Sequence, residues 1–166
     1  FINSFLSRME PAIAEHHGFI DKYIGDAIMA LFSQSADDAL QASIAMLQRV
    51  QRYNQERIGY GKKPIAIGIG INTGCLMLGT VGGRNRMDST VISDTVNVAA
   101  RIERMTRLYN THLLISHHTF LQLNNSNDYA MRVIDRVQVK GKTTFVSVYE
   151  VFETDPPPQR DAKIQS

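Results

Sequence analysis

Residues 88–103 constrain the fold most, because the pattern of their side chains changes period within a few positions. The β-branched residues within 89–92 favour a short strand, and the Ser-Asp pair that follows offers a side-chain oxygen to cap a helix. In that helix Asn97 and Arg101 are four positions apart, so both project from one face. Small and apolar residues fill most other positions. We therefore expect a strand followed by a helix that packs its opposite face on a sheet.

The side chains of Asn97 and Arg101 also indicate a function. An amide and a guanidinium held one helical turn apart form a set of hydrogen-bond donors for phosphate and ribose oxygens. An isolated pair of this kind is more often the solvated face of an ordinary amphipathic helix. Its interpretation therefore depends on the rest of the chain.

The overall composition indicates one core and excludes several classes of protein. The 166 residues are 43% hydrophobic, enough for one sizeable core. Because 18 basic and 16 acidic residues nearly balance, charge gives no argument for a nucleic-acid partner. A single cysteine excludes an internal disulfide framework, and no apolar run approaches the roughly 20 residues that span a bilayer. The chain starts within a helical pattern and without Met, so we expect a piece of a longer protein.

Apolar spacing along the chain predicts alternating helices and strands. We expect helices over residues 1–16 and 37–57, a hairpin of strands 19–24 and 27–32 turning at Gly25-Asp26, strands at 65–71, 75–81, 113–116, 130–139 and 144–152, and a helical turn near 119–123. With one more strand in front, this order gives the ferredoxin-like βαββαβ arrangement, an α+β fold, with added C-terminal strands and a helix. The first strand is expected to be missing from this chain. Residues 154–166, which include three consecutive prolines, are expected to form an extended, disordered tail.

Four segments resemble, in their order and spacing, the catalytic domain of class III nucleotide cyclases. They are Lys22-x-x-Gly25-Asp26, Gly70-Ile71-Asn72-Thr73-Gly74, Thr90-x6-Asn97-x3-Arg101 and Val139-Lys140-Gly141-Lys142. Each motif alone is weakly specific, but four in register are a strong match. We assign residues 1–153 to this domain.

The resemblance implies a chemistry and a role for each motif residue. Domains of the family pair head-to-tail, and a nucleoside triphosphate is cyclised at their interface with release of pyrophosphate. Two divalent ions, Mg²⁺ or Mn²⁺, are implied, with Asp26 as one of two metal-binding aspartates. Asn97 would orient the ribose, Arg101 would neutralise charge at the α-phosphate, and Lys140 would contact the terminal phosphates.

Base choice follows from Lys22 and Thr90, which match the two purine-selecting positions of the family. An ammonium is only a donor, which suits the acceptor N1 of adenine, and a threonine hydroxyl can accept from the 6-amino group. Guanine would set its N1–H donor against the Lys22 donor, at a cost of roughly 1–3 kcal/mol in a buried site. We therefore expect an adenylyl cyclase that uses ATP. Thr90 is similar to the subclass with bicarbonate-responsive members, and regulation by bicarbonate stays open.

The resemblance also implies a homodimer, and it implies a second metal-binding aspartate that we expect this chain to lack. In the family, the counterparts of Lys22 and Asp26 serve different active sites, so a symmetric dimer would build two sites and a monomer would be inactive. The family's other metal-binding aspartate lies in the strand expected to be missing. We therefore expect this chain alone to be inactive.

Two alternatives remain open at this stage. One is a guanylyl or dual-specificity cyclase. The other is a non-catalytic cyclase-homology module that dimerises or binds nucleotide to relay a signal, which the missing aspartate favours. We expect a cytoplasmic domain used in intracellular signalling, with an upstream regulatory or sensor domain. Membrane attachment of the full-length protein stays open.

Overall fold

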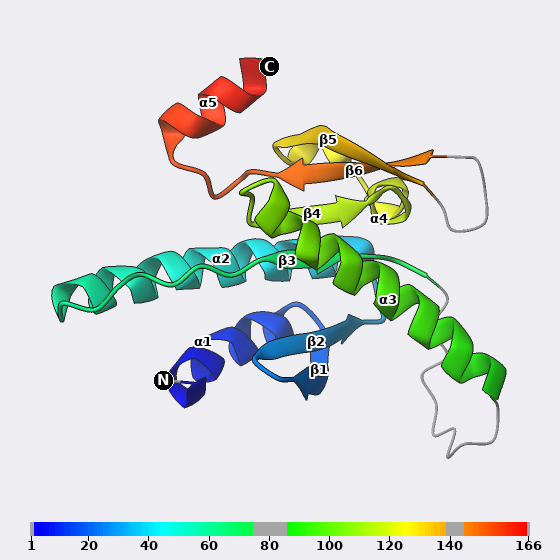
Figure 1. Ribbon diagram of the computed structural model, residues 1–166, viewed down its shortest axis with the longest axis horizontal. Coiled ribbons are helices and arrows are strands. Elements are labelled where there is room, and N and C mark those ends of the chain that lie inside the picture. Colours follow the sequence, from blue (N-terminus) through cyan, green and yellow to red (C-terminus); the bar gives the residue numbers. More distant parts are fainter. Residues whose placement is uncertain (1, 75–85, 139–144, 166) are drawn as a thin grey trace. The chain divides into compact units, whose positions relative to one another are not determined.

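The computed structural model describes residues 2–74, 86–138 and 145–165, with the backbone alone for residues 2–3 and 86–93. The chain divides into two compact units. The first comprises Phe1–Ile67, Leu123–Asn125 and Phe152–Ser166, and the second Gly68–Gln122 and Ser126–Val151. Figure 1 labels the elements of both units.

The first unit consists of helices and one hairpin. Its elements are α1 (Ile2–Glu15), β1 (Gly18–Ile24), β2 (Ala27–Phe32), α2 (Ala36–Gly59) and α5 (Pro157–Gln165). α1 packs against α2 and β1. The core contains Met9 and Ile13 from α1, Leu31 from β2, and Leu40 and Leu47 from α2, all buried. The predicted first helix, hairpin and second helix are confirmed.

The hairpin turns tightly at the predicted position. β1 and β2 pair antiparallel, with Ile24 opposite Ala27, and Gly25 adopts φ of 62° in the turn. Positive φ costs glycine little, so it suits this position. A register irregularity lies between Ile20 and Lys22, and bulges of this kind redirect the side chains that follow.

The second unit contains a four-stranded sheet. Its elements are β3 (Ile69–Ile71), α3 (Arg86–Leu108), β4 (Leu113–Ser116), α4 (His117–Gln122), the short 3₁₀ helix η1 (Ser126–Asp128), β5 (Met131–Gln138) and β6 (Phe145–Val151). The strand order is β3-β4-β6-β5, with β3 and β4 parallel and the other pairs antiparallel. The three last predicted strands and the helical turn near 119–123 are confirmed. The strand predicted at 75–81 lies outside the described residues.

Within the described residues, the fold is mixed α+β, as predicted, and its strands form two sheets. β3 is shorter than the strand predicted over 65–71, because the main chain at Ile65 is satisfied elsewhere. The Asn54 amide donates to the Ile65 carbonyl and accepts from the Ile65 N–H, both over 2.7 Å. Ile65 thereby bonds to α2 instead of a strand. The strand expected before residue 1 stays a prediction.

The strand predicted at 89–92 is wrong, because α3 runs from Arg86 through these positions. β-Branched residues lose only a few tenths of a kcal/mol in a helix, so a long helix can extend through them. The face of α3 opposite Asn97 and Arg101 packs on β3 and β4, as predicted. Val98 and Ala100 are exposed, whereas Ile102 and Thr106 are buried.

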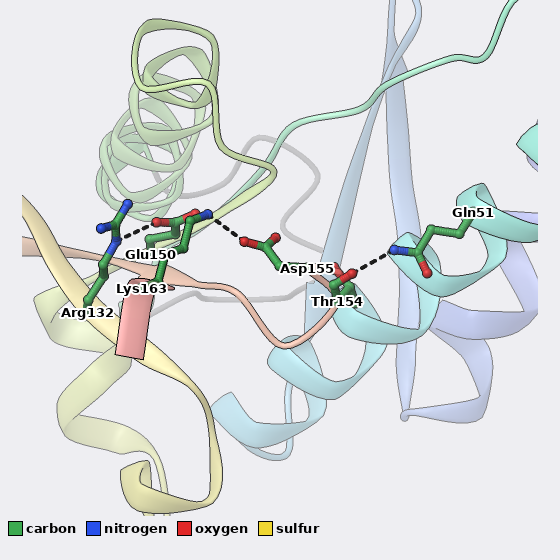
Figure 2. A network of polar contacts seen from close by, with 6 residues as sticks. All are labelled: Gln51, Arg132, Glu150, Thr154, Asp155 and Lys163. Carbon is green, nitrogen blue, oxygen red and sulfur yellow. Dashed lines mark hydrogen bonds and ion pairs between the residues drawn. The ribbon is translucent and has the colours of Figure 1, made fainter. Parts of the chain in front are cut away.

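The C-terminal segment forms helix α5 where we expected an extended, disordered tail. Proline fits the first turn of a helix, where its missing N–H is not needed, and Pro157 takes that position. The Lys163 ammonium lies 2.5 Å from the Asp155 carboxylate, and the Gln51 amide of α2 donates to the Thr154 carbonyl over 2.7 Å (Figure 2). These contacts hold the segment in the first unit.

Figure 2 also shows an ion pair that joins β5 to β6 in the second unit. The Glu150 side chain is 2% exposed and accepts from Arg132 Nε over 2.8 Å. A buried carboxylate is costly unless it is paired, so loss of Arg132 should destabilise this end of the sheet.

Among the described helices, none combines the length and the apolar character that a bilayer crossing requires.

Candidate active site

The predicted donor pair lies on the exposed face of α3. Asn97 and Arg101 are both exposed and are one helical turn apart, as their spacing predicts. Within the described part of the chain, neither side chain has a hydrogen bond or ion pair that would occupy it. Both are therefore available to a ligand that carries phosphate or hydroxyl oxygens.

The opposite face of α3 packs directly on β3, and the lack of a side chain at Gly68 and Gly70 allows this close approach. A Cβ at Gly70 would lie 2.3 Å from the Glu103 main-chain nitrogen and 2.6 Å from the Ala99 carbonyl oxygen. One at Gly68 would lie 2.1 Å from the Thr106 hydroxyl oxygen. At Gly70 the close atoms are main-chain atoms and leave no room for a side chain, whereas at Gly68 the Thr106 side chain would have to move. Glycine on β3 thus sets the depth at which the helix sits.

A network of amide and hydroxyl groups continues this contact past the end of β3. Asn72 is half-buried; its amide nitrogen donates to the Thr95 carbonyl of α3 over 3.2 Å, and its amide oxygen accepts from the Ser116 hydroxyl over 2.8 Å. The Ser116 oxygen also accepts from the main-chain N–H of Thr119 over 3.2 Å. The Thr119 and Thr73 hydroxyl oxygens lie 2.9 Å apart. Asn72 therefore connects β3, β4 and α3.

Sequence reasoning did not find this link. Asn72 entered only as a member of the segment Gly70–Gly74 that resembles a family strand ending, and no periodicity pairs it with Thr95, which is 23 positions away. The close Gly-x-Asn-x-Gly spacing is the one available signal, because it marks a backbone approached closely by another element.

Lys22 and Asp26 are both exposed on the hairpin of the first unit. The Lys22 ammonium lies 4.0 Å from the Asp21 carboxylate, and the Lys22 side chain is 60% exposed. This ion pair therefore holds the ammonium only weakly. Asp26 follows Gly25 in the turn, where no described side chain bonds to its carboxylate. Both groups are thus free to meet a ligand.

Tyr23 holds this part of the hairpin against α1. Its hydroxyl donates to the Glu10 carboxylate over 2.7 Å. This hydrogen bond, with smaller contributions from desolvation and the Glu10 charge, raises the pKa of Tyr23. The contact fixes the strand residue next to Lys22.

The Asp26 carboxylate suits a divalent ion, although it is only one ligand. Carboxylate oxygens are the ligands that Mg²⁺ and Mn²⁺ prefer, and this one projects from a turn without a competing partner among the described residues. The described residues contain no cluster of three or more His, Cys, Asp or Glu side chains that could hold a metal ion. Asp26 therefore fits as part of a metal site and not as a whole one.

The remaining predicted site residues are only partly described. The backbone of Thr90 lies in α3, but its side chain is outside the described part of the structure, as is Lys140 altogether. Lys22 and Asp26 belong to the first unit, and Asn97 and Arg101 to the second. The roles predicted for these residues stay predictions.

The described structure is a mixed α+β scaffold with an exposed Lys/Asp hairpin and an exposed Asn/Arg helix, the residues on which the resemblance to nucleotide cyclases rests. The chain matches the family described as the adenylate and guanylate cyclase catalytic domain over residues 1–151 and belongs to that family.

Two curated relatives and one solved structure illustrate the similarity. The chain is 47% identical over 157 residues to an adenylate cyclase of Anabaena cylindrica, covering 91% of this chain and 31% of that protein. It is 37% identical over 171 residues to the terminal-differentiation-specific adenylate cyclase of Dictyostelium discoideum, covering 99% and 8%. The crystal structure of an adenylyl cyclase from P. aeruginosa matches the fold with a TM-score of 0.63 at 23% identity, covering 92% and 81%. The chain thus spans less than a third of the length of these curated relatives.

Proposed function

We propose that this chain is the catalytic domain of an adenylyl cyclase, which converts ATP to 3′,5′-cyclic AMP and pyrophosphate. The observation that carries the proposal is the 47% identity, over 91% of the chain, to a relative named adenylate cyclase. The exposed donor pair of Asn97 and Arg101 supports it, because a phosphoryl transfer needs donors aimed at the reacting phosphate.

The proposed reaction is an intramolecular displacement. The ribose 3′-oxygen bonds to the α-phosphorus, the bond from that phosphorus to the pyrophosphate oxygen breaks, and the 3′-hydroxyl proton passes to solvent. Asn97 would hold the ribose so that its 3′-oxygen faces the α-phosphate, and Arg101 would stabilise the negative charge that develops there. Lys140 would bind the terminal phosphates that leave.

Divalent ions complete the proposed chemistry. Bound Mg²⁺ or Mn²⁺, two ions per site, would stabilise charge on the attacking and leaving oxygens, and Asp26 would be one of the ligands. We propose that a second aspartate of the natural protein provides further ligand oxygens for these ions.

We propose adenine selection by Lys22 and Thr90. The Lys22 ammonium would donate to N1 of adenine, and the Thr90 hydroxyl would accept from the 6-amino group. Guanine would leave the Lys22 donor facing the N1–H donor, so GTP should be a poor substrate.

We also propose that the active site is shared by two chains. One chain would supply Asp26, and its partner would supply Lys22, Asn97 and Arg101. A symmetric homodimer would then hold two equivalent sites.

The test uses the natural protein that contains this sequence, with any segment that precedes residue 1. Cyclic nucleotide formation is measured with Mn²⁺-ATP and with Mn²⁺-GTP. We expect cyclic AMP from ATP and little cyclic GMP from GTP. A clear preference for GTP would instead favour a guanylyl cyclase, and no product from either nucleotide would favour a non-catalytic signalling module.

A further inference from the structure

We infer that Asn72 is a positioning residue for the proposed cyclase reaction, because its amide fixes the helix that carries Asn97 and Arg101. The inference rests on the proposed function for its kinetic consequence. Asn72 itself is half-buried at the end of β3 and acts through α3, so it is not proposed to contact the nucleotide.

The contact made by Asn72 is close to the proposed catalytic pair. Its amide nitrogen lies 3.2 Å from the Thr95 carbonyl oxygen, and Thr95 precedes Asn97 by two positions. By α-helix geometry, the same carbonyl accepts from the N–H of Ala99, so the Asn72 amide is an added donor on the turn that contains Asn97. A shift of that turn would move Asn97 and Arg101 together.

The other side of the Asn72 amide is fixed as firmly. Its oxygen accepts from Ser116, which is 4% exposed and bonds to the fully buried Thr119. If the amide swung away, the buried Ser116 hydroxyl would lose its Asn72 acceptor, which is costly. Asn72 thus transmits the rigid position of the β4–α4 junction to α3.

Steric contact and the amide hydrogen bond constrain α3 in different ways. At Gly70 the close approach to Ala99 and Glu103 sets how near the helix lies to the strand. Such a contact does not stop the helix from sliding or rotating slightly along the strand. A directional hydrogen bond to one carbonyl does, since its strength falls steeply with misalignment.

Asn54 offers a matched control in the first unit. Like Asn72 it is half-buried, its amide nitrogen donates to a main-chain carbonyl (Ile65, 2.7 Å), and its oxygen accepts a second hydrogen bond, from the Ile65 N–H. Changing either asparagine to aspartate keeps the acceptor and removes the donor. Asn72→Asp and Asn54→Asp therefore make the same chemical change at sites with and without a link to α3.

The experiment measures kcat, KM for ATP and thermal stability of both variants in the natural protein. We expect similar losses of stability, but a fall in kcat of about 10- to 100-fold only for Asn72→Asp, with KM changed far less, because small misplacements of catalytic groups cost that much. Equal falls in kcat for the two variants, or none for Asn72→Asp, would overturn the inference.

Hydrogen exchange tests the same inference without enzyme activity. In Asn72→Asp we expect faster exchange of the α3 amides at residues 97–101 than in the unsubstituted protein and in Asn54→Asp. Unchanged exchange there would refute the positioning role. If the unsubstituted protein makes no cyclic AMP, the proposed function fails while this readout still decides the role of Asn72. Should Asn72→Asp not fold, the pair Asn72→Ala and Asn54→Ala repeats both measurements without an added charge.

Discussion

The amide of Asn72 donates to the main-chain carbonyl of Thr95, 3.2 Å away and two positions before Asn97 in the chain. One strand end is thereby bonded to the helix turn from which the proposed ribose-binding group projects. The donor pair on α3 is exposed, yet its support reaches into the buried junction of β4 and α4. A buried network beneath an exposed site can therefore fix the positions of the side chains that the site presents.

Arg101→Ala should lower kcat about 10²- to 10³-fold while changing KM for ATP little, because the proposed contact strengthens as charge develops on the α-phosphate. Steady-state kinetics of cyclic AMP formation would measure it. Arg104→Ala is the matched control, since Arg104 is also exposed on α3 but three positions further on. If both variants lose activity equally, general surface charge and not a specific contact explains the effect.

Lys22→Glu should lower the ratio of kcat/KM for ATP to that for GTP roughly tenfold or more. A carboxylate would repel the adenine N1 lone pair and accept from the guanine N1–H. Competition assays with both nucleotides would give the ratio. Lys63→Glu makes the same charge change at another exposed lysine of the same unit and should leave the ratio unaltered. An unchanged ratio for Lys22→Glu would remove Lys22 from base selection.

Gly70→Ala should destabilise the second unit by about 1–3 kcal/mol, because the new methyl group would press on the backbone of α3. Urea unfolding would measure the change. Gly59→Ala is the control: a Cβ at that exposed end of α2 meets nothing within 4 Å, so this change should be neutral or slightly stabilising. Similar destabilisation by both would show that β3 and α3 are not in the close contact described.

Tyr109 and Asp135 give the second unit a predictable acid response. The Tyr109 hydroxyl donates to the Asp135 carboxylate; this bond, with help from the Arg136 N–H, lowers the pKa of Asp135 below its usual 3.8. A lowered folded-state pKa stabilises the fold above the usual value, and that stability is lost as pH falls from 3.8 toward the folded-state pKa. The same hydrogen bond raises the pKa of Tyr109, so the contribution of Tyr109 to the stability of the fold is lost only as pH rises past 10.0.

Tyr109→Phe should therefore lower stability at neutral pH and make the loss of stability below pH 4 shallower. Thermal unfolding at a series of pH values would show both effects. Tyr60→Phe serves as the control, because Tyr60 is 83% exposed. An acid profile of Tyr109→Phe identical to that of the unsubstituted protein would contradict the assigned hydrogen bond.

Much of the fold follows from local sequence signals. The hairpin at Gly25-Asp26 and strand β4 were predictable because their turn residues and apolar runs agree with the tertiary structure. The start of α3 was not, since weak β propensity at 89–92 gave way to a long helix. α5 was missed because its stability comes from Lys163, Asp155 and Gln51, contacts that no local pattern reveals.

The candidate site, like the fold, could be predicted only in part from local sequence signals. The common face of Asn97 and Arg101 follows from helical periodicity, and the structure places both on the exposed side of α3. The support of that helix by Asn72 depends on a contact between residues 23 positions apart, which only the folded chain brings together. Local spacing thus identified the groups that could act but not the residue that holds them.

The most direct test of the account mixes two inactive variants of the natural protein. Asp26→Ala should remove the metal ligand, and Arg101→Ala the phosphate contact, so each variant alone should form almost no cyclic AMP. In mixed dimers one site would draw both intact groups from different chains. An equal mixture should therefore recover about a quarter of normal activity, since half the dimers are mixed and each has one intact site of two. A mixture as inactive as its components, with an active unsubstituted protein, would contradict the shared site.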